Sequence, residues 1–176
     1  AAAGNIFNDF RDVEIDRINR PGRPLPAGLI SSGLAQLEAA VLALAGLAAA
    51  WWLGPSTGLI ATTALLLLFA YSLYLKITTI WGNLVVAIVA AAAFPFGAIA
   101  TGTWGRSWIP AGFALLFHLG REIVKDLEDV AGDDSVGART LPLRWGASVA
   151  RWSTTLIFLI LIGLTFLPGL RGIYGI

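Results

Sequence analysis

The residues best suited to chemistry form an acidic cluster near the start of the sequence. Asp9, Asp12 and Asp16 stand at positions i, i+3 and i+7, so they share one face of a helix. Asn5 and Asn8 lie on or beside that face. Like charges one helical turn apart repel one another, more strongly where the dielectric is low. A helix that carries this stripe therefore needs a compensating positive charge.

A second acidic cluster occurs much later in the chain. Glu122, Asp126, Asp129 and Asp133 run at i, i+4, i+7 and i+11, again on one face if the helix continues. Both clusters stand at the end of an apolar helix, where charged groups of membrane proteins are usually functional. The plainer alternative is that both consist of interfacial charges paired in local salt bridges.

Carboxylates without sulfur or imidazole partners favour a hard divalent cation, Mg²⁺ first. The chain has no Cys and one His, so Cys-ligated zinc, a thiol nucleophile and a His-rich metal site are excluded. Mg²⁺ is usually held by one or two carboxylates together with substrate phosphates. Two facing carboxylate stripes therefore predict a diphosphate held between Mg²⁺ ions. Basic residues close enough in topology to neutralise that anion are Arg17, Arg20, Arg23, Lys76, Arg121, Lys125 and Arg139.

The elements that must position these residues are membrane-spanning helices. Of the 176 residues 57% are hydrophobic and 13% are charged, and the mean hydropathy is +0.77. One small water-soluble core cannot bury that much apolar surface. The net charge of +1 makes a nucleic-acid partner unexpected. Crossing the hydrocarbon takes about 20 residues, and five apolar runs approach this length: Gly33–Leu53, Gly58–Leu75, Asn83–Thr103, Ile109–Ala131 and Gly146–Leu167.

We therefore expect an all-α, multi-span transmembrane bundle of about five full spans. Ala1–Asn19 is interpreted as the last turns of a further, partial helix. Pro95 predicts a kink inside the third span, and Gly132–Trp145 is predicted to be a long polar loop. If the helices alternate in direction, both acidic clusters and most Lys and Arg residues lie on one side, which the positive-inside rule makes cytoplasmic.

Several of these strings resemble the motifs of the UbiA superfamily of intramembrane prenyltransferases. The segment Asn8–Gly28 is similar to the first aspartate-rich motif of that family, with its aspartates at Asp9, Asp12 and Asp16. Tyr71–Lys76 resembles the Tyr/Lys segment, and Asn83 follows it. Glu122–Asp133 resembles the second acidic motif, with a Glu where many members have Asp at its first position.

The resemblance implies a nine-helix fold around a central cavity, of which residues 1–176 would be a single domain that is incomplete at both ends. It implies a prenyltransferase with Mg²⁺ as cofactor and with a prenyl diphosphate donor, a lipophilic acceptor and membrane lipid as partners. The implied catalytic residues are Asp9, Asp12, Asp16, Asp129 and Asp133. The implied metal ligands are these five with Glu122 and Asp126. The implied substrate-binding residues are Asn5, Asn8, Arg17, Arg20, Arg23, Tyr71, Lys76, Asn83, Arg121, Lys125 and Arg139.

Within the superfamily, Lys125–Asp133 together with Arg139–Leu143 looks most like the digeranylgeranylglyceryl phosphate synthases of ether-lipid synthesis. That branch implies transfer of a geranylgeranyl group to geranylgeranylglyceryl phosphate. A quinone precursor or a chlorophyllide-type acceptor remains the alternative, because those members share parts of the motif. Two other classes stay open: a divalent-cation transporter, and a non-catalytic protein that binds lipid diphosphates. Acidic residues at one interface beside many Arg and Lys residues disfavour a path for cations through the membrane. The sequence predicts no oligomeric state.

Overall fold

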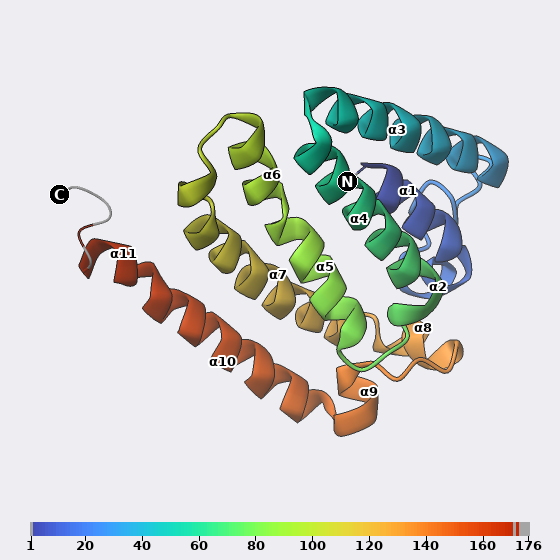
Figure 1. Ribbon diagram of the computed structural model, residues 1–176. Coiled ribbons are helices and arrows are strands. Elements are labelled where there is room, and N and C mark those ends of the chain that lie inside the picture. The colour runs from blue at the N-terminus through green and yellow to red at the C-terminus, as the bar shows by residue number, and fades with distance from the viewer. Residues whose placement is uncertain (1, 171, 173–176) are drawn as a thin grey trace.

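The structure is a computed structural model that describes residues 2–170 and 172, and these residues form helices and connections without a β-strand (Figure 1). The α-helices are α1 (Ala2–Arg11), α2 (Val13–Asn19), α3 (Ser32–Leu53), α4 (Pro55–Ala70), α5 (Trp81–Ala91), α6 (Ala93–Ala100), α7 (Trp108–Glu128), α8 (Val130–Ser135), α9 (Leu141–Trp145), α10 (Ala147–Thr165) and α11 (Leu167–Leu170). A π-helical turn, η1 (Tyr71–Leu75), continues α4, and a 3-10 turn, η2 (Trp104–Arg106), precedes α7.

The long helices are arranged side by side in a row (Figure 1). Helix α3 packs on α1 and α4, α4 packs on α5 and α6, α5 packs on α7, and α7 packs on α10. The short helices α2 and α8, which come from distant parts of the sequence, contact each other where the long helices of the row end (Figure 1). That contact brings the two acidic motifs together.

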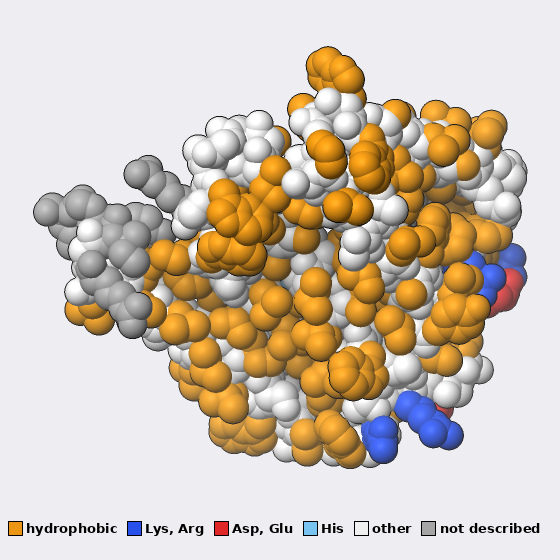
Figure 2. Space-filling model, viewed as in Figure 1, with side chains coloured by type: hydrophobic (Ala, Val, Ile, Leu, Met, Phe, Trp, Pro, Cys, Tyr) orange, Lys and Arg blue, Asp and Glu red, His pale blue; other side chains and the backbone are white. Residues whose placement is uncertain are grey.

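Four helical segments are long and apolar enough to cross a membrane: Ser32–Leu53, Pro55–Leu75, Trp81–Ala100 and Ala147–Leu170. The expected fifth span, Ile109–Ala131, corresponds to α7, whose 21 residues are apolar only in the first half. The expectation of an all-α multi-span bundle is confirmed. On the face seen in Figure 2, hydrophobic side chains cover the long helices, and charged side chains gather at the end near α2 and α9.

Backbone chemistry explains where the spans turn and bend. Gly54 has φ +148°, a conformation that side chains rarely adopt, and Pro55 then occupies the first turn of α4. The third span is interrupted at Ala92, between α5 and α6. Because Pro95 has no N–H for the carbonyl of Ala91, the helix breaks one turn ahead of it, and the expected kink is confirmed.

Three boundaries differ from the sequence-based expectation. Residues 1–19 were expected as one helix, but the described part forms α1 and α2 with Asp12 between them. The stripe that begins at Glu122 is likewise interrupted, because α7 ends before Asp129. Gly132–Trp145 is not a loop throughout. It contains the end of α8 and the short helix α9, where Pro142 stands in the first turn, a position that tolerates proline.

Glycine lets neighbouring spans approach closely, as is common in membrane helices. A Cβ on Gly120 of α7 would lie 2.9 Å from the ring of Phe158 on α10. A Cβ on Gly58 of α4 would collide with the indole of Trp51 on α3. The first contact sets how closely α7, which carries the second acidic motif, approaches α10, and the second sets how closely α4 approaches α3.

Candidate active site

The two acidic motifs line one cavity of about 610 Å³. Its apolar lining is small, so it suits a polar headgroup better than a long hydrocarbon. The carboxylates around it are Asp9, Asp12, Asp16, Glu122, Asp126, Glu128, Asp129 and Asp133. The cations are Arg20, Arg23, Lys76, Arg121 and Lys125, and the remaining polar residues are Asn5, Asn8 and Tyr71. Eight carboxylates against five cations leave a formal excess of three negative charges.

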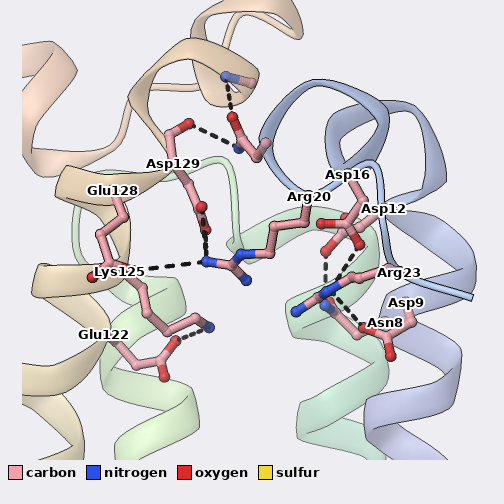
Figure 3. Close-up of polar contacts among 12 residues, drawn as sticks. Asn8, Asp9, Asp12, Asp16, Arg20, Arg23, Glu122, Lys125, Glu128 and Asp129 are labelled. Carbon is pink, nitrogen blue, oxygen red and sulfur yellow. Dashed lines mark hydrogen bonds and ion pairs between the residues drawn. The ribbon is translucent and has the colours of Figure 1, made fainter. Parts of the chain in front are cut away.

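The first motif is held by Arg23, which lies in the proline- and glycine-rich segment after α2. Its Nη1 donates to Asp9 Oδ1 at 2.9 Å and to Asp16 Oδ2 at 2.7 Å (Figure 3). Asp16 is 5% exposed, and its ion pair with Arg23 offsets the cost of burying the carboxylate. The segment must fold back for Arg23 to reach both carboxylates, which explains why an irregular stretch follows the acidic helix.

The third aspartate, Asp12, is held from a different element. Its carboxylate forms an ion pair with Lys76 and accepts a hydrogen bond of 2.7 Å from Asn8 Nδ2. Lys76 directly follows the π-helical turn η1, whose widened ring is closed by the bond from Lys76 N to Tyr71 O at 3.0 Å. The same turn places Ser72 to donate to Asn8 Oδ1 at 3.2 Å. Such π-turns are frequent at functional sites.

The first two carboxylates of the second motif, Glu122 and Asp126, have partners on α7 and on α5. Glu122, which is 4% exposed, accepts from Arg121 at 2.8 Å and from Lys125 at 3.1 Å. Asp126 accepts from Asn83 Nδ2 at 2.7 Å. These contacts hold both carboxylates of α7 at the wall of the cavity.

At the edge of the cavity, partial burial raises the pKa of Asp133 to about 6, and the neighbouring carboxylate of Asp129 adds to the rise. The carboxyl of Asp133 therefore exchanges its proton near pH 6, and a cation bound beside it would favour the ionised form.

The two acidic stripes share a local distortion. Asp12, between α1 and α2, has φ −97° and ψ 6°, and Asp129, between α7 and α8, has φ −96° and ψ 7°. Both values fall in the sparsely populated bridge region, where active-site residues are often found. Despite these breaks, the carboxylates of both stripes still line the cavity.

Two residues at the end of α2 connect the motifs directly. Arg20 Nη2 donates to both carboxylate oxygens of Asp129, at 2.8 and 3.0 Å (Figure 3). Asn19 Nδ2 donates to the carbonyl of Asp129 at 3.1 Å, and its Oδ1 accepts from Gly132 N at 3.0 Å. We call these two bonds of Asn19 the amide clamp.

The amide clamp was missed from the sequence, because an uncharged Asn after an acidic stripe gives no signal of its own. The close approach also depends on Gly132, where a Cβ would lie 2.7 Å from Asn19 Cγ.

Three of the expected substrate-binding residues are not part of the cavity wall. Arg17 pairs with Glu14 at 2.7 Å on the exposed side of α2. Arg139 lines a second pocket on another side of the 74–80 segment. Asn83 is buried and contacts Asp126 instead of lining the cavity. The other expected metal- and substrate-binding residues are brought together by the structure.

The residues present fit Mg²⁺ by donor type and by charge. The metal-binding atoms offered by the acidic side chains are all carboxylate oxygens, and the excess negative charge of the cavity favours divalent cations. Within the described ranges, no three or more Asp, Glu, His or Cys side chains are grouped so that they could hold one metal ion. This agrees with sites in which one or two carboxylates hold each Mg²⁺ and phosphate oxygens complete the coordination.

Comparison with known proteins defines the class. The model of the UbiA prenyltransferase family matches residues 1–176, and the chain belongs to this family. A solved structure described as an apo structure of a UbiA homologue from Aeropyrum pernix K1 superposes with a TM-score of 0.82 at 21% identity, covering 99% of this chain and 68% of that one. It supports the fold.

Relatives with higher identity carry a more specific name. Digeranylgeranylglyceryl phosphate synthase of Thermococcus kodakarensis is 39% identical over 172 residues, which are 98% of this chain and 62% of that protein. The protein of the same name from Methanoculleus marisnigri is 45% identical over 144 residues, 81% of this chain and 52% of that protein. A solved structure described under that enzyme's name, in membranes, has a TM-score of 0.74 at 34% identity and covers 99% of this chain and 62% of that one. The chain thus spans about three fifths of the first of these relatives.

Proposed function

We propose that the protein containing this chain transfers a geranylgeranyl group from its diphosphate to geranylgeranylglyceryl phosphate, in a Mg²⁺-dependent reaction of ether-lipid synthesis. The observation that carries the proposal is the charge of the cavity, in which acidic motifs from distant parts of the chain meet with an excess of three negative charges. Such a cavity repels a diphosphate until divalent cations bind. The names of the relatives in the previous section support the choice of donor and acceptor.

The residues proposed to hold Mg²⁺ are Asp9, Asp12, Asp16, Glu122, Asp126, Asp129 and Asp133. When bound, the metal would neutralise the diphosphate, so that it can leave the allylic carbon. The chain itself contributes cations. Arg20, Arg23 and Lys76 are now paired with carboxylates of the two motifs. If these carboxylates held a metal, the guanidinium groups of Arg20 and Arg23 and the ammonium group of Lys76 would be free to donate to phosphate oxygens.

The acceptor's nucleophilic atom is a glycerol hydroxyl. It attacks the allylic carbon as the carbon–oxygen bond to the diphosphate breaks, and its proton passes to a base or to water. The apolar helices behind the cavity would hold the isoprenoid chain and keep water from the reacting carbon. From the distribution of Lys and Arg we further infer that the cavity faces the cytoplasm.

The test is release of pyrophosphate by the purified protein with geranylgeranyl diphosphate and two acceptors, geranylgeranylglyceryl phosphate and 4-hydroxybenzoate. We expect product with the first acceptor only, and none in EDTA. Asp12→Asn and Asp129→Asn should each lower turnover by at least about a hundredfold, as expected when a group that stabilises the transition state is lost. Asp134→Asn is the matched control, because Asp134 is exposed and lies outside the cavity wall.

Turnover that survives EDTA would refute the metal-dependent mechanism. Product with 4-hydroxybenzoate alone would move the protein to the aromatic-acceptor branch of the family. Binding of the diphosphate without any product would instead support a non-catalytic, lipid-diphosphate-binding role.

A further inference from the structure

A second pocket lies beside the candidate active site and has the opposite charge. Its volume is about 520 Å³, and it is lined by the segment that precedes α5 and by the segment around α9. Arg139 and Arg144 are its charged lining residues, and no carboxylate lines it, so its formal charge is +2. Ile77 lines both pockets, so the 74–80 segment separates a negative cavity from a positive one.

Both arginines are anchored by contacts that leave their charge uncompensated. Arg144 Nη1 donates to Thr79 Oγ1 at 3.1 Å, and its guanidinium lies 5.7 Å from the ring centroid of Trp145. The backbone of Arg139 donates to Ile77 O at 2.8 Å. Neither side chain forms an ion pair with a carboxylate of the described residues. Most of their N–H groups are therefore available to an anion.

The rest of the pocket is suited to the membrane interface. Tyr74, Trp81 and Trp145 line it and are 69%, 62% and 54% exposed. Two membrane-spanning segments begin beside it, at Trp81 and at Ala147. Exposed Tyr and Trp at the ends of spans sit at headgroup level, and basic pockets between spans bind anionic headgroups. Figure 2 shows charged side chains at this end of the bundle and apolar ones along the spans.

We propose that this second pocket binds the phosphate of an anionic membrane lipid, with its acyl or isoprenoid chains lying along the outer face of the bundle. The charge and the arginine geometry fit any phosphate. The exposed aromatic side chains and the position at the ends of two spans favour a lipid over free phosphate. The proposal is independent of prenyl transfer, because the pocket lies on the other side of the 74–80 segment from the acidic motifs.

The test is lipid binding to the purified chain, measured by native mass spectrometry with phosphatidylglycerol and phosphatidylcholine of equal chain length. Each arginine beside a lipid phosphate contributes about a fivefold preference, so the pair predicts a preference of about twenty-five-fold for phosphatidylglycerol. The double variant Arg139→Gln with Arg144→Gln should lose most of it. The matched control, Arg11→Gln with Arg151→Gln, removes the same charge from exposed arginines outside the pocket and should keep it.

Equal loss in both double variants would overturn the proposal, since the preference would then reflect net charge alone. No preference in the original chain would overturn it as well. Full competition by inorganic phosphate at the same free concentration would assign the pocket to a free anion and not to a lipid.

A fluorescence measurement covers the case in which the arginine variant fails to fold. Phosphatidylglycerol with brominated acyl chains should quench the tryptophan fluorescence of the protein. Trp145→Phe should remove a larger share of that quenching than Trp52→Phe. Trp52 is 87% exposed but lies at the opposite end of α3 from the charged residues. Equal shares would contradict the location of the site.

Discussion

The amide clamp predicts that one substitution lowers or raises the free energy of unfolding depending on the residue at position 19. Gly132→Ala places a Cβ against the side-chain amide of Asn19, which must move away and give up its bonds to Asp129 O and Gly132 N. Two such bonds are worth about 2 kcal/mol. Alanine in place of glycine inside α8 recovers about 1 kcal/mol of helix propensity. We therefore expect Gly132→Ala to lower the free energy of unfolding by about 1 kcal/mol.

In the background of Asn19→Ala the obstacle and the bonds are both absent. Asn19→Ala alone should cost about 2 kcal/mol, because the two backbone groups lose their partner. Adding Gly132→Ala should then raise stability by about 1 kcal/mol through propensity alone. The same substitution thus destabilises one background and stabilises the other, with a coupling energy of about 2 kcal/mol.

The assay is reversible unfolding of the four proteins in mixed micelles, followed by circular dichroism against denaturing detergent. Gly33→Ala is the control, because a Cβ at that helical glycine meets open space. Its effect should be the same with Asn19 and with Ala at position 19. If Gly132→Ala changes stability equally in both backgrounds, the clamp does not join the two motifs and the reasoning fails.

Two further predictions concern pH and helix packing. The folded-state pKa of Asp133 is raised to about 6, from an ordinary value of about 4, so the contribution of this carboxyl to stability falls as pH rises between these values. Below about pH 6, protons compete with Mg²⁺ for the same carboxyl. Titration of Mg²⁺ binding by calorimetry should show affinity falling below pH 6, and Asp133→Asn should flatten the profile; an unchanged profile would contradict the assignment. Gly120→Ala should lower the free energy of unfolding by about 1–3 kcal/mol in the same assay, because the added Cβ collides with Phe158. Gly112→Ala, whose added Cβ meets open space in the same helix, should not destabilise the protein. Equal effects of the two substitutions would refute the packing argument.

The parts of this fold that the sequence predicts are those that depend on composition and helical spacing. Apolar runs of about 20 residues identify the spans, and the spacing of Asp9, Asp12 and Asp16 puts them on one side of the chain. Both features are local, so no partner has to be known. The kink ahead of Pro95 was predictable for the same reason, because it follows from a missing N–H.

The remaining features depend on contacts between distant segments. The π-helical turn at Tyr71–Leu75 has the composition of an ordinary apolar helix, and its wider ring is accompanied by the tertiary contacts of Ser72 and Lys76 with the first motif. The location of Arg139 could not be read from its closeness in sequence to the second motif. Its backbone N–H donates to the carbonyl of Ile77, and Ile77 contributes to the wall between the two pockets.

The ion pairs across the cavity explain how a site of like charges can fold before any ligand binds. Arg20 reaches from the end of α2 to Asp129, while Arg23 and Lys76 pair with carboxylates of the first motif. Each cation therefore offsets the repulsion within a stripe, and Arg20 also holds the two stripes together. Since Mg²⁺ would compete for the same carboxylates, its binding and the release of these cations toward an incoming phosphate are coupled. On the proposed mechanism, Arg20→Gln should weaken the diphosphate's binding and also loosen the contact between α2 and α8.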